Sequence, residues 1–219
     1  LRLIPSCSIA NAIETFDIMP RTDGFMLPQV KSIFPDMPHM IGYAVTAVIG
    51  AQMPPSKNMN VSRLETIEAI LSVPEPRILV MQDIDYPNVI GSFWGEVQAN
   101  IYKSMGCVGT ITDGGVRDLD EMRALGFNAF ASEILVSHAY VHLIDVGVPV
   151  TVGGMKVNTG DLLLGDQHGV VGIPMDIATE IPAAVKRVEA REQEMISVCQ
   201  SPDFTVDKLR DQIRSMYGG

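Results

Sequence analysis

The chain has 219 residues, of which 47% are hydrophobic and 19% charged, so it can bury a full-sized core as one domain. The formal net charge is −10 without a Lys/Arg cluster, which argues against a nucleic-acid partner, because a phosphate backbone requires a basic face. No apolar run is long enough to cross a bilayer. Three widely spaced cysteines without a C-x-x-C pair suit a reducing compartment. We therefore expect a globular, cytoplasmic protein without a membrane partner.

Apolar periodicity predicts the elements of the first half of the chain. A helix is expected around residues 9–16, behind Ser6 and Ser8, and a strand in 40–49. Asn60 is the expected N-cap of a helix that ends before Pro74 and carries the apolar residues Val61, Leu64, Ile67 and Leu71. The segment RILVM (77–81) predicts a buried strand. For the following Asp83 and Asp85, we favour solvated turn residues over carboxylates that support a site from behind.

The second half continues the alternation of strand and helix. We expect a helix in 91–103, a strand in 107–112, a short helix from about 118 to 125 and a strand near residue 129. Short β segments broken by glycine fill 146–173, with hairpin turns expected at Gly153-Gly154 and Gly160-Asp161. Helices are expected from 175 to about 198 and from 206 to 216. The pattern predicts a mixed α/β layered fold, with residues 1–219 as a single domain and a C-terminal helical arm at about 175–217.

The stretch GTITDGGVRDLDEM (109–122) brings Arg117 and Asp118 together behind a strand and a Gly-Gly turn. Asp is a hard oxygen ligand for Mg²⁺ or Mn²⁺, and Arg offers fixed donors to a carboxylate or an oxyanion. Spacing alone favours a simpler interpretation, in which Asp118 caps a helix with Glu121 in a capping-box pattern and Arg117 is solvated.

A second motif, WGEVQANIYKSMG (94–106), places Gly95 where a helix begins. The free N–H groups of a helix N-terminus bind carboxylate or phosphate groups, although Gly95 can equally be a plain helix start behind a core Trp94. One helix and one strand separate Gly95 from Arg117, so both can lie at the same end of neighbouring elements. A helix end for a carboxylate, an Arg for an oxyanion and an Asp for a metal make an α-keto acid site.

These two motifs, together with GVPVTVGGMKVNTGDLLLGDQHGVVGIP (147–174) and the opening PSCSIANAIE (5–14), resemble the RraA-like family, which includes the 4-hydroxy-4-methyl-2-oxoglutarate aldolases. The aldolases of that family carry a Gly, about twenty residues, Arg-Asp and an acidic residue three places later. Gly95, Arg117, Asp118 and Glu121 match this pattern. The non-enzymatic branch, which regulates ribonuclease E, lacks the complete set.

The resemblance implies an α/β/β/α sandwich of the swivelling-domain type that assembles as a homotrimer or homohexamer. It implies a divalent-metal aldolase that cleaves a 4-hydroxy-2-oxo acid to pyruvate and also decarboxylates oxaloacetate. Asp118 would bind Mg²⁺ or Mn²⁺, and Arg117 would stabilise the enolate oxygen. Glu96 would order a metal-bound water, and Glu192 or Glu194 of a neighbouring subunit would reach the site. The substrate carboxylate would be held by the amides of Gly95, Glu96, Val97 and Gln98.

The segment SEILVSHAYVHLIDVG (132–147) departs from the expected aldolase pattern. We expect it to shape the distal half of the substrate, so the resemblance leaves the identity of the substrate open. His138 and His142 have the i, i+4 spacing of a helical metal pair, but no acidic motif accompanies them, which favours structural histidines. The alternative function is an RraA-type regulator that binds a ribonuclease.

Overall fold

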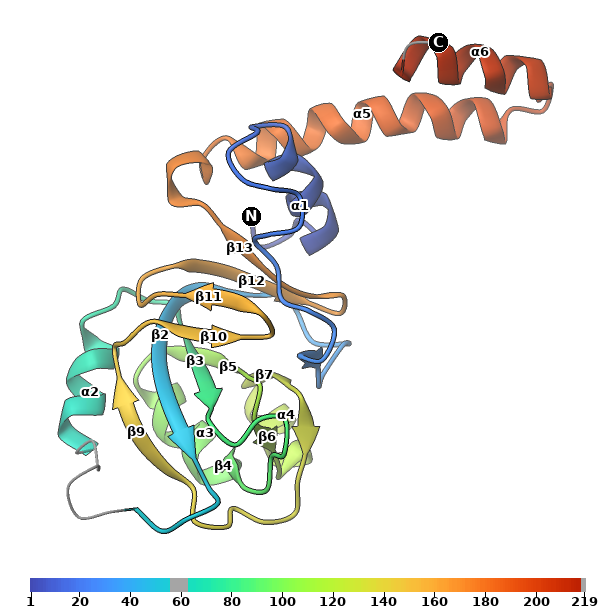
Figure 1. Cartoon of the computed structure of the whole chain (residues 1–219). Coiled ribbons are helices and arrows are strands. Elements are labelled where there is room, and N and C mark those ends of the chain that lie inside the picture. The colour runs from blue at the N-terminus through green and yellow to red at the C-terminus, as the bar shows by residue number, and fades with distance from the viewer. Residues whose placement is uncertain (56–62, 218–219) are drawn as a thin grey trace.

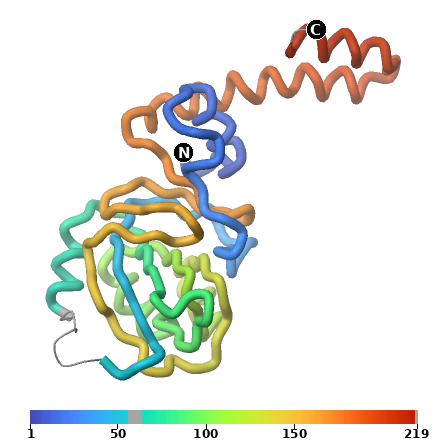
Figure 2. The backbone as a smooth tube through the Cα atoms, in the orientation of Figure 1, coloured from blue at the N-terminus to red at the C-terminus, as the bar shows by residue number. Residues whose placement is uncertain are grey.

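The computed structural model describes residues 1–55 and 63–217. The chain forms a body of strands and helices from which a pair of helices projects (Figures 1 and 2). Within the described residues, no helix is long and apolar enough to cross a membrane.

An eight-stranded mixed sheet organises the body, in the order β1-β7-β5-β3-β2-β12-β13, with β9 also pairing with β2. Its centre is parallel, because β2, β3, β5 and β7 run in one direction, whereas β1, β9, β12 and β13 join antiparallel. The strands are β1 Lys31–Ser32, β2 Met40–Gly50, β3 Arg77–Asp83, β5 Cys107–Thr112, β7 Asn128–Ala131, β9 His142–Val146, β12 Leu162–Asp166 and β13 Gly169–Ile173.

Strand β3 shows how the sheet is buried on both faces. Leu79 and Met81 point into one hydrophobic core, and Ile78 and Val80 point into another. All four are fully buried, as the continuous apolar run predicts for a parallel strand that is covered on both sides.

Helices α2 (Arg63–Leu71), α3 (Glu96–Ser104) and α4 (Leu119–Leu125) contribute to the first core. The predicted helix near α2 exists, but its N-cap Asn60 and Val61 lie outside the described residues. The prediction of its apolar face needs a correction: Leu64, Ile67 and Leu71 are exposed, whereas Thr66 and Ile70 are buried.

The second core lies under the hairpin of β10 (Val150–Val152) and β11 (Met155–Val157). Its turn is Gly153-Gly154, both with positive φ, as predicted for a two-residue hairpin. Gly160-Asp161, in contrast, is not a hairpin turn, because β11 pairs with β10 and β12 pairs with β2 and β13.

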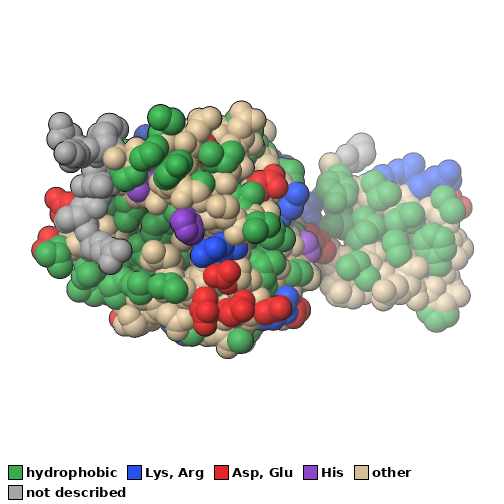
Figure 3. Space-filling view, turned by 90° about the horizontal axis from the view of Figure 1, so that it is seen from below, with side chains coloured by type: hydrophobic (Ala, Val, Ile, Leu, Met, Phe, Trp, Pro, Cys, Tyr) green, Lys and Arg blue, Asp and Glu red, His purple; other side chains and the backbone are tan. Residues whose placement is uncertain are grey.

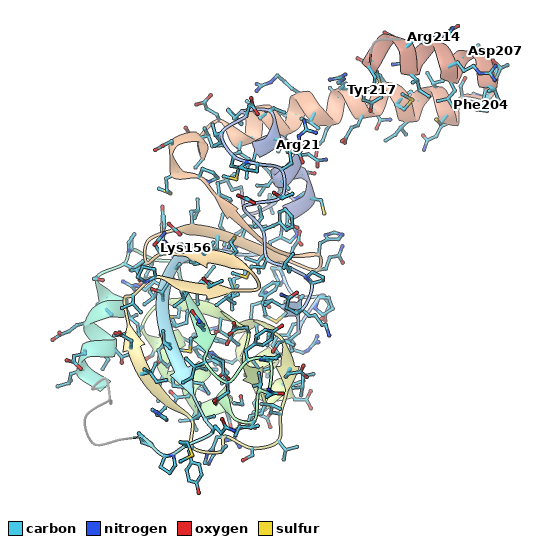
Figure 4. The ribbon with its side chains drawn as sticks, in the orientation of Figure 1. Arg21, Lys156, Phe204, Asp207, Arg214 and Tyr217 are labelled. Carbon is cyan, nitrogen blue, oxygen red and sulfur yellow. The ribbon has the colours of Figure 1, made fainter. Side chains whose placement is uncertain are left out.

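A third core joins α1 (Ser6–Glu14) and α5 (Ile181–Gln200) to β12 and β13. Buried Asp166 accepts hydrogen bonds from Ser6 N at 2.7 Å and Ser6 Oγ at 2.8 Å, which fixes the start of α1. The outer half of α5 and α6 (Val206–Tyr217) form the projecting arm, on which Phe204, Asp207, Arg214 and Tyr217 lie (Figure 4).

Two predicted helices begin later than expected. Residues 91–103 are not one helix: β4 (Ser92–Trp94) precedes α3. Likewise, Met175–Ile177 is a short 3₁₀ helix (η1), and α5 begins at Ile181, with Pro182 in the first turn, where its missing N–H costs nothing.

Candidate active site at the ends of three parallel strands

A second, three-stranded parallel sheet carries the candidate site. Its order is β4-β6-β8, with β4 Ser92–Trp94, β6 Gly115–Val116 and β8 Glu133–Ile134. Trp94 pairs with Val116, which pairs with Ile134, so the three strands end at one edge. The segments that follow them begin with Gly95, Arg117 and Leu135. Carboxyl ends of parallel strands are where ligand sites form in α/β folds.

Gly114, directly before β6, and Gly115, its first residue, are packed closely against their neighbours. A Cβ on Gly114 would lie 2.9 Å from Asp83 Oδ2, and a Cβ on Gly115 would lie 2.5 Å from Leu135 Cδ1. Ser92 Oγ donates to the carbonyls of Trp94 at 2.6 Å and Gly115 at 2.8 Å, which links β4 to β6. The Gly-Gly pair therefore allows the β6 turn to sit tightly between its neighbours.

Gly95, Arg117 and Asp118 lie in contact, as the sequence motif predicted. A Cβ on Gly95 would lie 2.6 Å from Asp118 Oδ2 and 3.3 Å from Arg117 Nε. Arg117 Nε lies 3.9 Å from Asp118 Oδ2, and each of the two side chains is 35% exposed. A cation and an anion thus share one open edge of the sheet, with Gly95 as the residue that makes room for them.

The capping interpretation of Asp118 does not hold in the structure. Asp118 occupies the N-cap position of α4, but its side chain makes no capping hydrogen bond there. Instead, Asp118 Oδ2 accepts from the backbone N–H of Glu96, at 3.0 Å, across the site. Its φ of 53° lies in the left-handed region, which non-glycine residues occupy at some cost and often at functional sites.

The N-terminus of α3 faces the same place. Its first N–H, from Glu96, is used by Asp118, whereas the N–H groups of Val97 and Gln98 donate no hydrogen bond among the described residues. These two amides, at the positive end of the helix dipole, are available to an anion.

A pocket of about 160 Å³ occupies this edge. Each water takes about 30 Å³ in the liquid, so the pocket holds the volume of about five waters and suits a small organic acid. Seen from this end, histidine, basic and acidic side chains lie next to one another (Figure 3). The pocket is lined by Ser92, Phe93, Gly95, Val97, Gln98, Arg117, Asp118, His138 and Val141.

Some predicted site residues are not among the residues that line the pocket. The side chains of Glu96 and Glu121 are exposed, and neither residue lines it. Glu192 and Glu194 lie on α5, at the opposite end of the molecule from β4 and β6 (Figure 1). Their contribution to the site of a neighbouring subunit stays a prediction.

Two acids next to the β6 turn, Asp83 and Asp113, are buried, although Asp83 was predicted to be solvated and Asp113 was assigned no role. Asp83 is not a solvated turn residue: it is 2% exposed, and its backbone N–H donates to Asp113 Oδ1 at 2.7 Å. Asp83 Oδ2 is buried and has no hydrogen-bond partner among the described residues. Burial raises the pKa of both carboxyls to about 6. The sequence signal for Asp83 was the polar run 82–85, which begins within the last residues of β3.

The histidine interpretation is corrected in one respect. His138 and His142 do not share a helix, because His138 lies in the loop after β8 and His142 begins β9. Each Nδ1 lies within hydrogen-bond distance of a backbone carbonyl: His138 of Ala139 at 2.7 Å, and His142 of Tyr140 at 2.9 Å. Of the two, only His138 lines the pocket.

The side chains of the pocket can be compared with the ligands that a divalent metal ion requires. Within the described residues, no three His, Cys, Asp or Glu side chains gather closely enough to hold a metal ion alone. The hydrogen bond and ion pair of the Asp118 carboxylate use Oδ2, which leaves Oδ1 free to bind a ligand. Mg²⁺ commonly uses one or two carboxylates, with water and substrate oxygens completing its shell. Asp118 therefore fits such an ion if a chelating ligand shares it.

Comparison with known proteins agrees with this architecture. A protein of Halalkalibacterium halodurans whose name proposes a 4-hydroxy-4-methyl-2-oxoglutarate aldolase is 27% identical over 100 residues, 45% of this chain and 48% of that one. An uncharacterised protein of Pseudomonas syringae has a similar solved structure, with a TM-score of 0.71 and 24% identity over 95% of this chain and 90% of that one.

A third similar structure is RraAS2 of Streptomyces coelicolor, described as an unusual member of the RNase ES inhibitor RraA protein family. Its TM-score is 0.67, with 22% identity over 90% of this chain and 92% of that one. At these identities, the solved structures establish the fold alone.

The fold is thus that of a mixed α/β protein with a small pocket at the ends of parallel strands. The model of the RraA-like family, described as Aldolase/RraA, matches residues 7–171, about three quarters of the chain. The chain belongs to the RraA-like family, as its motifs predicted. That family contains both aldolases and ribonuclease inhibitors.

Proposed function

We propose that this protein is a divalent-metal-dependent lyase that cleaves a 4-hydroxy-2-oxo acid to pyruvate and decarboxylates oxaloacetate at the same site. One observation carries the proposal: Arg117, Asp118 and the free amides of α3 converge on a single small pocket. A regulator that only docks on a nuclease has no need for this convergence. The partial match to a proposed aldolase is consistent with it.

The residues of the chain divide the work by their chemistry. The N–H groups of Val97 and Gln98 bind the carboxylate next to the keto group, where the helix dipole favours negative charge. Arg117 donates to the keto oxygen as negative charge develops on it, and a charge-assisted hydrogen bond of this kind strengthens in the transition state. The pocket volume of about 160 Å³ suits a small acid.

Asp118 is the residue that would hold Mg²⁺ or Mn²⁺. The ion, when bound, supplies Lewis-acid stabilisation of the developing enolate, which is worth several kcal/mol. Asp118 stays fixed by the Glu96 N–H and by its left-handed backbone, so the carboxylate is already oriented before any ligand arrives. Glu96 keeps its proposed role of ordering water at the rim.

We further propose the finer fold and assembly that the family resemblance implies. The fold is the α/β/β/α sandwich of the swivelling-domain type, residues 1–219 form a single domain, and the protein assembles as a homotrimer or homohexamer in the cytoplasm. The pocket is open on one side in a single chain, and Glu192 or Glu194 of a neighbour closes it. Light scattering of the purified protein measures this assembly, and a monodisperse monomer argues against it.

The experiment that tests the function measures pyruvate release by coupling to lactate dehydrogenase and NADH. Oxaloacetate and 4-hydroxy-4-methyl-2-oxoglutarate are offered separately, each with Mg²⁺ and with EDTA, against a blank for spontaneous decarboxylation. We expect turnover that EDTA abolishes. Arg117→Ala and Asp118→Ala should each remove activity without unfolding the protein, because both side chains are partly exposed. Folded, metal-loaded protein that is silent on both acids favours the ribonuclease regulator.

A further inference from the structure

Aldol cleavage requires a group that accepts the proton of the C4 hydroxyl, and the pocket restricts which residue can do so. Arg117 cannot accept a proton, because its guanidinium stays charged and has no acceptor. Asp118 already accepts the Glu96 N–H and is the proposed metal ligand. Glu96 does not line the pocket. Of the described residues that line it, His138 is the one that carries an imidazole, a ring with one nitrogen that can accept a proton and one that can donate.

Hydrogen bonding fixes the tautomer of His138. Its Nδ1 lies 2.7 Å from the carbonyl oxygen of Ala139, and a carbonyl only accepts, so Nδ1 carries the hydrogen. In the neutral ring, Nε2 is then a bare acceptor. This is the state that a general base needs before the reaction.

The loop that carries His138 is held firmly. Ser92 N donates to Ser137 O at 3.0 Å, and Val141 N donates to His138 O at 3.0 Å. Ala139 has a φ of 44°, an uncommon conformation that surrounding contacts must enforce. A Cβ on Gly91 would lie 2.6 Å from His138 O, so Gly91 lets this loop pack against the strand region before β4. The loop after β8, which carries His138, is therefore held in place by these hydrogen bonds and by close packing against Gly91.

We propose that His138 is the catalytic proton carrier of aldol cleavage, an inference that rests on the proposed function. Nε2 takes the proton from the C4 hydroxyl, whose oxygen becomes a carbonyl as the C3–C4 bond breaks. The electron pair of that bond forms the pyruvate enolate. The imidazolium then returns the same proton to C3, which gives pyruvate and a second carbonyl compound. No proton or electron is gained or lost overall.

Aldol cleavage and oxaloacetate decarboxylation share the pyruvate enolate but differ in whether a hydroxyl proton must be removed. Oxaloacetate loses CO₂ without any hydroxyl deprotonation, and the enolate can take its proton from water. Decarboxylation therefore needs the carboxylate and oxyanion contacts but does not need His138. A substitution that removes only Nε2 chemistry should impair aldol cleavage selectively.

The test uses His138→Asn, because the Asn amide places an N–H donor near the position of Nδ1 and lacks a ring nitrogen. We expect kcat for 4-hydroxy-4-methyl-2-oxoglutarate and 4-hydroxy-2-oxoglutarate to fall by about 10²- to 10⁴-fold, the usual contribution of a general acid-base group. Oxaloacetate decarboxylation should change by less than about threefold, because the shared contacts remain. Inhibition of decarboxylation by oxalate, a planar enolate analogue, should also stay unchanged.

His142→Asn is the matched control. His142 has the same kind of Nδ1 contact to a backbone carbonyl but does not line the pocket, so both activities should stay at wild-type level. Equal loss of both activities in His138→Asn, or no loss, overturns the inference. So does selective loss of aldol cleavage in Glu96→Gln instead. A wild-type enzyme that only decarboxylates refutes the role of His138, whereas one inactive on every acid refutes the proposed function as well.

Discussion

The buried carboxyl pair beneath the site makes a prediction about stability that can be worked out from the structure. Asp83 is 2% exposed, its Oδ1 accepts the Asp85 N–H at 2.9 Å, and its Oδ2 has no hydrogen-bond partner in the part of the chain that the structure describes. Burial, opposed in part by the Asp85 N–H and assisted by the Asp85 charge, raises the pKa of Asp83 from 3.8 to about 6. In the native protein this carboxyl therefore holds its proton more tightly than in the unfolded chain.

The direction in which this carboxyl changes stability with pH follows from the difference in proton binding between the folded and unfolded chains. A raised carboxyl pKa contributes stability that is fully present below pH 4 and is lost as the pH rises from about 4 to 6. One pKa unit corresponds to about 1.4 kcal/mol, so a shift of about two units corresponds to about 3 kcal/mol for this carboxyl. Asp83→Asn cannot ionise and keeps an oxygen for the Asp85 N–H. The free energy of unfolding of Asp83→Asn, relative to wild type, should improve by about 2–3 kcal/mol between pH 4 and pH 7.

Urea unfolding, followed by the fluorescence of Trp94, measures this difference, because the single tryptophan is fully buried. Asp145→Asn, at an exposed carboxylate, is the control and should run parallel to wild type across the same pH range. The protein concentration must be held constant, since assembly also contributes to stability. A constant difference between Asp83→Asn and wild type from pH 4 to pH 7 would refute the reasoning.

Two further substitutions test the packing of the site and of α1. Gly95→Ala should lower kcat/KM for pyruvate release by about 100-fold, because its Cβ would lie 2.6 Å from Asp118 Oδ2 and displace that carboxylate. The φ of Gly95 is −167°, which any residue adopts, so backbone strain would not be the cause of the loss. Gly172→Ala, whose Cβ meets only atoms at 3.6 Å or more, should keep full activity; equal rates in both variants would contradict the crowding argument. Asp166→Ala should lower the free energy of unfolding by about 2–4 kcal/mol in urea titrations, because two buried hydrogen bonds from Ser6 lose their acceptor. A loss below about 1 kcal/mol would show that other contacts anchor α1.

The parts of the fold that could be predicted are those in which local pattern and tertiary burial agree. The continuous apolar runs of β2, β3 and β5 predict strands correctly, because a strand that is covered on both faces needs apolar residues on both. Strand β4 was missed because three residues are too short for an alternating pattern and the helical pattern of α3 follows directly. The face of α2 was misjudged because Leu64 and Leu71 satisfy helical spacing although they are exposed in the chain.

The candidate site shows the same contrast between residues that local sequence places correctly and residues that only tertiary contacts place. Gly95 and Arg117 could be brought together from spacing alone, because one helix and one strand separate two parallel strand ends. His138 could not, because β8 has only two residues and the following loop turns through a positive φ at Ala139, which alanine does not signal. Asp83 was missed for a related reason. Its burial depends on Gly114, a residue from another strand end, whose missing side chain leaves the space that Asp83 Oδ2 occupies. Local sequence specifies which residues end a strand, but the pairing of distant strands decides which of those ends share a pocket.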